Sequence, residues 1–171
     1  KPVVLLVEDN EDFRFYLKDN LKLQYTICEA RNGKEGLQQA FAVVPDLIVS
    51  DIMMPELNGI DLCKKIRTDP RTSHIPVVLL TARTAEEQKM EGFESGANDY
   101  VTKPFNFEIL QSRLKNLLAQ REAFQKAFHK HIHVKAGDVH ITSLDEKLIT
   151  RAIKVVEDNL ADPDFSVEDF S

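Results

Sequence analysis

Short apolar runs alternate with longer amphipathic segments along the first 121 residues. Segments of strand length recur five times: apolar residues dominate Val3–Val7, Leu47–Val49 and Val77–Leu80, Tyr25–Glu29 alternates as an edge strand would, and Tyr100–Thr102 is short. Apolar residues at helical spacing follow each run, although Met90 and Phe93 mark the fourth of these segments only weakly. This alternation predicts a parallel sheet with helices on both faces and right-handed crossovers. The repeat closes near Arg121, which predicts one compact domain over residues 1–121.

Four of the five predicted strands end beside side chains that can carry chemistry. Glu8 and Asp9 follow the first run, Asp51 ends the third, Thr81 the fourth and Lys103 the fifth. Each type has a plain structural explanation: an Asp after a strand is often a turn residue or a helix N-cap, a Thr has high strand propensity, and a Lys is usually solvated. Because ligands bind at the carboxyl ends of parallel strands, all five together predict a functional site at that edge of the sheet.

The composition is ordinary for a globular protein, with 43% hydrophobic and 29% charged residues. The 22 basic and 28 acidic side chains give a net charge of −6, so no nucleic-acid footprint is expected over the whole chain. Cys28 and Cys63 are far apart in the sequence and show no disulfide pattern, which favours a reducing compartment. No apolar run approaches the ~18 residues of a membrane helix. We expect this part to be cytoplasmic and without membrane contact, with a membrane-anchored parent as an alternative for the longer protein.

The chain from about Lys1 to Arg121 resembles the receiver domain of two-component response regulators. The matching motifs are VEDN (7–10), SDIMMPELNG (50–59), LTAR (80–83) and YVTKPF (100–105). The resemblance implies a flavodoxin-like, doubly wound α/β fold with a five-stranded parallel sheet in the order 2-1-3-4-5, and phosphorylation of Asp51 by a histidine kinase. One position departs from the family pattern, because Glu8 stands where Asp is commoner and leaves Asp9 as the surer metal ligand.

The three acidic residues of these motifs predict a magnesium site. Glu8, Asp9 and Asp51 would crowd negative charge together, which is unfavourable unless one carboxyl is protonated or a cation binds. A few hard oxygen ligands completed by water suit Mg²⁺, and the resemblance adds the backbone carbonyl of Met53 as a further ligand. With Mg²⁺ present, Asp51 can act as a carboxylate nucleophile on a phosphohistidine and form an acyl phosphate.

The transferred phosphoryl group needs positive and hydrogen-bonding partners, because its transfer relies on positioning and charge neutralisation. Lys103 supplies an ammonium and Thr81 a hydroxyl, while the small Ala82 leaves room beside them. The resemblance also implies a cis peptide bond between Lys103 and Pro104, which is uncommon in proteins. Tyr100 stands where the family places the aromatic ring of its conformational switch; a plain strand aromatic is the alternative.

Two further expectations concern the output and the lifetime of the signal. The resemblance places the output on the surface of the fourth helix, fifth strand and fifth helix, through a change in homodimerisation. Met53 and Arg83 stand where family residues overhang the approach of the hydrolytic water. Met53 offers an apolar thioether and Arg83 only donors, so we expect a slowly hydrolysed acyl phosphate. The alternative is that both side chains point to solvent and leave the rate unchanged.

The composition shifts beyond Arg121, and residues 122–141 are interpreted as a linker. A short heptad pattern is formed by Leu110, Leu114, Leu117, Phe124 and Phe128. The favoured interpretation is a fifth helix that buries one face and then continues as the linker; a coiled coil is the alternative. A strand would align His129, His131 and His133 on one face. Such a face would suit a metal site, but a polar linker also explains them.

Residues 142–171 predict the start of a second unit. Ser143 and Glu146 form a capping box for a helix, which Pro163 ends. The segment ITSLDEKLITRAIKVVEDNLADPDFSVEDFS (141–171) resembles the start of an AraC-type helix-turn-helix DNA-binding domain. It carries three basic and eight acidic side chains and stops before any recognition helix, so we expect DNA contact only through residues outside this chain.

The chain lacks an initiator Met and stops in mid-pattern at Ser171, so we expect a slice of a longer protein. A receiver followed by an AraC-type module is typical of free-standing regulators and of hybrid sensor kinases; the linker favours the hybrid form, with the histidine kinase in the same chain. We expect no enzyme activity in this part beyond Mg²⁺-dependent self-phosphorylation and dephosphorylation. A phosphatase would need a second acid at Met53, and a flavin-binding module would need a Ser/Thr/Gly-rich loop where residues 8–12 are mostly acidic.

Overall fold

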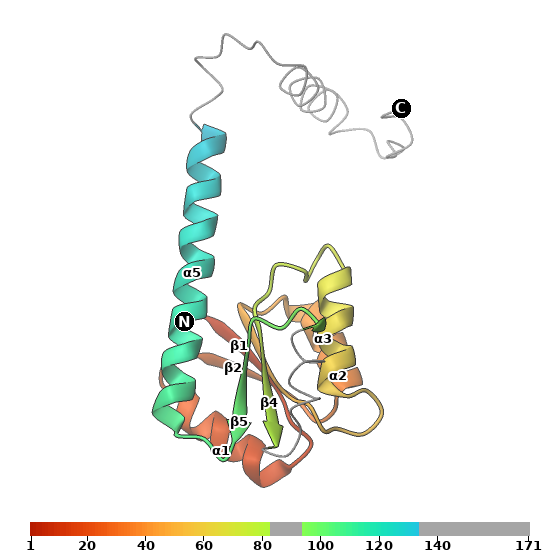
Figure 1. Cartoon of the computed structure of the whole chain (residues 1–171). Coiled ribbons are helices and arrows are strands. Elements are labelled where there is room, and N and C mark those ends of the chain that lie inside the picture. Colours follow the sequence, from red (N-terminus) through yellow and green to blue (C-terminus); the bar gives the residue numbers. More distant parts are fainter. Residues whose placement is uncertain (83–93, 134–171) are drawn as a thin grey trace, which may run out of the picture. The chain divides into compact units, whose positions relative to one another are not determined.

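The structure, a computed structural model, describes residues 1–82 and 94–133 (Figure 1). The strands are β1 (Val3–Val7), β2 (Thr26–Ala30), β3 (Leu47–Asp51), β4 (Val77–Ala82) and β5 (Asp99–Lys103). The helices are α1 (Glu11–Leu21), α2 (Gly33–Val43), α3 (Gly59–Thr68) and α5 (Phe107–His133). The fourth helix, predicted around Met90 and Phe93, lies outside the described residues.

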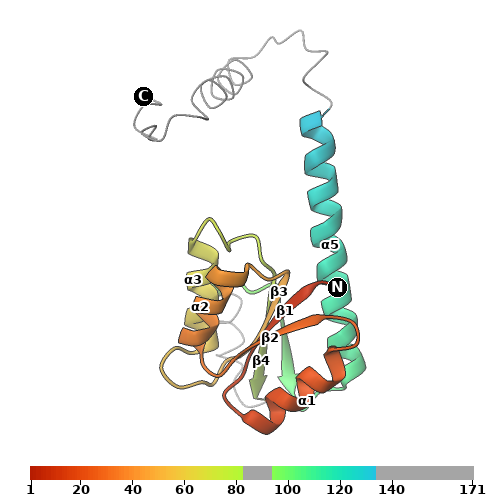
Figure 2. The ribbon, with the colours of Figure 1, turned by 180° about the vertical axis from the view of Figure 1, so that it is seen from behind.

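The strands form one parallel sheet in the order β2-β1-β3-β4-β5 (Figure 2), which confirms the predicted flavodoxin-like arrangement. Leu5 of β1 lies between Cys28 of β2 and Ile48 of β3 in the register. β2 pairs with one side of β1 and β3 pairs with the other side, so the order of the strands reverses at β1. Ligands bind outside the carboxyl ends of the strands at such a reversal, so the fold points to the edge where β1 and β3 end.

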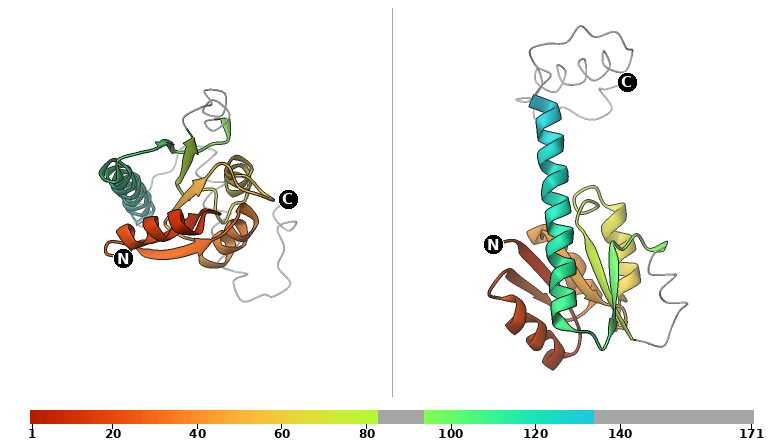
Figure 3. Two further views of the ribbon diagram at one scale, coloured as in Figure 1. Left: turned by 90° about the horizontal axis from the view of Figure 1, so that it is seen from below. Right: turned by 60° about the vertical axis from the view of Figure 1, so that its left-hand side comes forward.

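Two layers of helices cover the sheet. The helices α2 and α3 lie on one face, and α1 and α5 lie on the other (Figure 3). Successive residues of a strand point to opposite faces, so Leu5 packs in the layer of α2 and α3 while Leu6 packs in the layer of α1 and α5. Burial of these large aliphatic side chains is the main stabilising contribution to the two layers.

Asparagine caps begin three of the helices. The side-chain oxygens of Asn10, Asn32 and Asn58 each accept a hydrogen bond from the backbone N–H three residues later, at 2.8–2.9 Å. Each cap satisfies a backbone donor that the helix itself leaves unpaired. Asn10 follows β1 closely, so α1 begins beside the carboxyl edge of the sheet.

The long helix α5 buries its first turns against the sheet. Leu110 and Leu114 are completely buried among residues of β1, β3 and β4. This burial confirms the interpretation of a fifth helix with one buried face, and the coiled-coil alternative is wrong for these two positions. Their heptad spacing arises because a helix that covers a sheet also places an apolar residue every three or four positions.

Arg121, in the fourth turn of α5, makes an ionic contact at the amino-terminal edge of the sheet. Arg121 Nη1 donates to the backbone carbonyl of Asp46 at 2.6 Å and lies 3.1 Å from Asp46 Oδ1. The other carboxylate oxygen, Asp46 Oδ2, accepts from the backbone N–H of Val3 at 2.8 Å. One carboxylate therefore joins α5, β1 and the segment that leads into β3.

The chain divides into two units, Lys1–Gln125 and Lys126–Ser171. His129, His131 and His133 lie in α5, so they do not form the strand that would align them on one face. The AraC-like segment 142–171 and the predicted linker from residue 134 onward lie outside the described residues. No described helix, α5 included, is long and apolar enough to cross a membrane.

Backbone strain at Val44, the C-cap of α2, can be tested by substitution. Val44 adopts a left-handed conformation (φ 48°, ψ 67°), which is costly for a β-branched residue. Val44→Gly should therefore raise the free energy of unfolding by about 1 kcal/mol, because glycine is the usual residue at this position of a helix end. Urea denaturation monitored by circular dichroism measures the change.

A matched control is Val43→Gly, since Val43 is 41% exposed and Val44 is 40% exposed. Val43 is the last residue of α2, and glycine in a helix should lower the free energy of unfolding by up to ~1 kcal/mol. If both substitutions destabilise the protein equally, the strain at Val44 does not contribute to stability.

Candidate functional site

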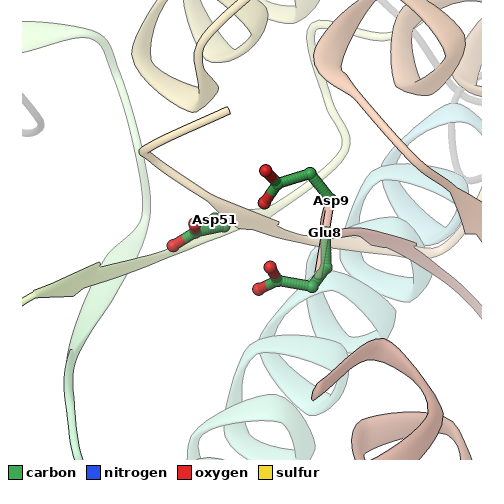
Figure 4. Close-up of side chains that lie close together, drawn as sticks. All are labelled: Glu8, Asp9 and Asp51. Carbon is green, nitrogen blue, oxygen red and sulfur yellow. The ribbon is translucent and has the colours of Figure 1, made fainter. Parts of the chain in front are cut away.

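Three carboxylates meet at the carboxyl edge of the sheet. Glu8 and Asp9 directly follow β1, and Asp51 is the last residue of β3. One carboxylate oxygen from each lies within 4.8 Å of the others, and the three side chains gather around the same space (Figure 4). Within the described residues, this is the one group of three or more acidic, His or Cys side chains close enough to hold a metal ion together.

Two of these carboxyl groups are buried. Glu8 is 2% exposed and Asp51 7% exposed, whereas Asp9 is open to solvent. Burial raises the pKa of Glu8; the negative charge of Asp51 adds to this, while the backbone N–H of Asn10 and the ammonium of Lys103 oppose it. Burial likewise raises the pKa of Asp51, again against the effect of Lys103. The fold therefore disfavours the ionised form of both groups, and a bound cation would favour it.

Lys103, at the end of β5, supplies a positive charge to both buried carboxylates. Its Nζ atom lies 3.0 Å from Asp51 Oδ1 and 3.2 Å from Glu8 Oε2. The carboxyl ends of β1, β3 and β5 are thus joined by one ammonium group. The Lys103–Pro104 peptide bond is cis, as the resemblance implied.

The position of Glu8 is fixed by contacts that sequence reasoning missed. The backbone N–H of Asn10 donates to Glu8 Oε1 at 3.0 Å, and the backbone N–H of Glu8 donates to the Ala30 carbonyl of β2 at 3.1 Å. Arg14 is buried, and its Nη1 donates to the backbone carbonyl of Glu8 at 2.8 Å. The spacing of Arg14 in the sequence indicates a buried side chain, because Arg14 lies three residues before the buried Leu17 on the same helical face.

Asp51 is held by a close approach of backbones. The N–H of Gly59, the first residue of α3, donates to the carbonyl of Ile52 at 3.0 Å. A Cβ atom built on Gly59 would lie 2.1 Å from the carbonyl oxygen of Asp51, so only glycine allows α3 to begin here. In the sequence, Gly59 stood out only as part of a motif. Its close approach to the backbone of Asp51 is visible only in the structure.

The other predicted site residues lie near this edge in different environments. Thr81 is buried on β4, and its hydroxyl donates to the carbonyl of Ala82 at 3.3 Å. Tyr100 is half-buried and packs in the layer of α2 and α3. Met53 is 61% exposed on the loop after β3. Arg83 lies outside the described residues.

Comparisons with known proteins agree with this geometry. The sequence model of the response regulator receiver domain matches residues 4–115. The chain is 46% identical over all of its 171 residues to histidine kinase P4 of Formosa agariphila, and spans 12% of that protein. It is 37% identical over 77% of its length to the DNA-binding dual master transcriptional regulator RpaA of Synechocystis, and spans 55% of it.

Solved structures show the same fold. The signal receiver domain of a signal transduction histidine kinase from Syntrophus aciditrophicus superposes with a TM-score of 0.67 at 31% identity, over 84% of this chain and 99% of that one. The receiver domain of a sensor histidine kinase from Pseudomonas aeruginosa gives a TM-score of 0.65 at 28% identity, over 69% and 98% of the two chains. The latter structure has a magnesium ion coordinated in its active-site cleft.

Removing one buried charge from the site should stabilise the metal-free protein. Asp51→Asn should raise the free energy of unfolding at neutral pH by roughly 1 kcal/mol, a typical size for a single substitution, because burial disfavours the wild-type carboxylate. Since folding raises the pKa of Asp51, the wild type regains this stability as pH falls toward 3.8, the ordinary value. Thermal melts from neutral to acidic pH should therefore show the advantage of Asn shrinking.

The same melts include two further variants and a metal titration. Asp9→Asn should act in the same direction but more weakly, because Asp9 is exposed. Asp19→Asn removes an exposed carboxylate of α1 and should have little effect. Mg²⁺ should raise the melting temperature of the wild type, as any ligand of the folded state does. Lower metal-free melting temperatures for both Asp51→Asn and Asp9→Asn would contradict the crowding of charge at the site.

Proposed function

The chain belongs to the response regulator receiver domain family, and we propose that it accepts a phosphoryl group on Asp51 from a histidine kinase. The observation that carries the proposal is the position of Asp51. Its carboxylate ends β3 between the acidic pair Glu8 and Asp9 and the ammonium of Lys103. An acceptor needs a nucleophilic oxygen beside groups that neutralise phosphoryl charge, and this edge of the sheet offers both.

In the proposed reaction, an Asp51 carboxylate oxygen forms a bond to phosphorus. The N–P bond of the phosphohistidine breaks, and the imidazole nitrogen leaves with the electron pair. Lys103 would neutralise charge on the phosphoryl oxygens. Thr81 would turn its hydroxyl from the Ala82 carbonyl to one of those oxygens, and the small Ala82 would leave room for the group.

The acidic cluster fits a hard divalent cation. Glu8, Asp9 and Asp51 would hold Mg²⁺ together with the backbone carbonyl of Met53 and water. When bound, Mg²⁺ would supply positive charge to the phosphoryl oxygens. The convergence of three carboxylates, two of them buried with raised pKa values, supports the assignment of a cation to this place.

The output would pass to neighbouring parts of a longer protein. We propose that Tyr100 takes the space that Thr81 leaves on phosphorylation, and that the fourth helix, β5 and α5 then form a homodimer surface. The match over the whole chain to a histidine kinase eight times longer supports a hybrid histidine kinase as the parent. In this proposal the receiver unit is cytoplasmic, the parent is either cytoplasmic or anchored in a membrane, and the output is an AraC-type DNA-binding domain. The likeness to a transcriptional regulator supports the second candidate, a free-standing regulator.

Phosphorylation is tested directly by intact-mass spectrometry. Incubation with acetyl phosphate and Mg²⁺ should add one phosphoryl group to the wild type and none to Asp51→Asn, because the amide cannot form the acyl phosphate. Asp19→Asn, with the same change in net charge, should be labelled like the wild type. Equal labelling of Asp51→Asn and the wild type would refute the assignment of the acceptor.

The lifetime of the acyl phosphate tests the proposed role of Met53. Its exposed thioether cannot orient a water molecule, so Met53→Asn should speed the release of phosphate several-fold by placing a hydrogen-bonding group near the acceptor. Leu23→Asn makes the same chemical change at another exposed position, 77% exposed, and should leave the rate unchanged. If release from Met53→Asn is as slow as from the wild type, Met53 does not set the lifetime.

A further inference from the structure

An aromatic ring faces the ammonium group of Lys103. The Lys103 Nζ atom lies 4.4 Å from the centroid of the Phe13 ring. This distance is well inside the range of a cation–π contact, in which the negative face of the ring attracts a cation. Among the described residues, the ammonium therefore contacts the Glu8 carboxylate, the Asp51 carboxylate and the Phe13 ring.

The Phe13 ring is itself held in place by two other aromatic rings. Phe105 contacts it edge-on, and Tyr16 stacks with it, both with ring centroids 6.1 Å apart. Tyr16 comes from α1, as Phe13 does, whereas Phe105 follows β5 two residues after Lys103. The ring is thus fixed between the helix that starts beside the acidic pair and the segment that carries the lysine.

Space for other positions of the Lys103 ammonium lies next to it. A cleft of about 360 Å³ lies beside it, lined by Phe13, Ala82, Lys103, Pro104 and Phe105. The Lys103 side chain is 27% exposed, and a flexible lysine stem reaches many positions. In the structure the Phe13 ring and the two carboxylates all contact the ammonium, so the cation–π contact favours the position beside the carboxylates over others in the cleft.

We propose that Phe13 is a positioning residue, which holds the Lys103 ammonium against Asp51 through a cation–π contact so that it meets the incoming phosphoryl group. The effect on phosphoryl transfer rests on the proposed function of Asp51; the effect on the position of Lys103 does not. A contact of this kind at a partly exposed site corresponds to a change in rate of about two- to five-fold.

The experiment changes the charge distribution over the face of the Phe13 ring and keeps the size of the ring. Pentafluorophenylalanine at position 13 fills nearly the same volume and lacks the negative face. Phe13→Tyr keeps that face, and Phe13→Leu removes the ring. The matched control is Phe15→Leu, because Phe15 lies on the same helix and is 67% exposed.

Two readouts separate positioning from packing. The first is the NMR chemical shift of the Lys103 ε-methylene protons, assigned with Lys103→Arg, because a ring face shields the nuclei above it. The second is the rate of Asp51 phosphorylation by acetyl phosphate at saturating Mg²⁺. We expect Phe13→Leu to lose the shielding, and both Phe13→Leu and the pentafluoro variant to react about two- to five-fold more slowly, with Phe13→Tyr and Phe15→Leu like the wild type.

The two proposals fail in different ways. Wild-type protein that gains no phosphoryl group refutes the proposed function, and the chemical shift still decides where Lys103 lies. A wild type that is phosphorylated at the same rate as the pentafluoro variant overturns the proposed role of Phe13 in transfer. A Lys103 shift that is unchanged in Phe13→Leu overturns the contact itself.

Discussion

The contact of one lysine with two buried carboxylates constrains much of the domain. Burying a carboxylate without a charged partner is costly, so Glu8 and Asp51 require Lys103 or a cation close by. β4 separates β3 from β5, so a side chain from β5 must cross the end of β4 to reach Asp51. A lysine is long enough, and its register partner on β4 is the small Ala82, which leaves the path open.

The backbone around the site supports these side chains. The buried Arg14 ties α1 to the backbone of Glu8, and Gly59 lets α3 begin against the backbone of Asp51. Both contacts hold main-chain atoms and leave the carboxylate oxygens directed at the shared space. A ligand of this site would therefore meet groups already in position, which reduces the conformational entropy lost on binding.

The fold was predictable from the sequence because parallel strands that are buried on both faces appear there as continuous apolar runs. Val3–Val7 and Leu47–Val49 show this clearly, and the site followed from the residues at the strand ends. Arg14 was missed because a charged residue is rarely buried. Its contacts with the backbone carbonyl of Glu8 and the carboxylate of Glu29 explain its place. The conformation of His129, His131 and His133 stayed open in the sequence, because a polar linker explained their alternation as well as a strand would; the structure places them in α5.

The ionic contact at Asp46 lies at the opposite end of the strands from the acidic cluster, since Asp46 immediately precedes β3 and Asp51 ends it. The first residue of β1 and the last buried turn of α5 bind the two oxygens of this one carboxylate. A mechanical load applied between these two elements would be carried by Asp46 at the amino-terminal edge. Such a load would therefore enter the sheet at the edge opposite the acidic cluster.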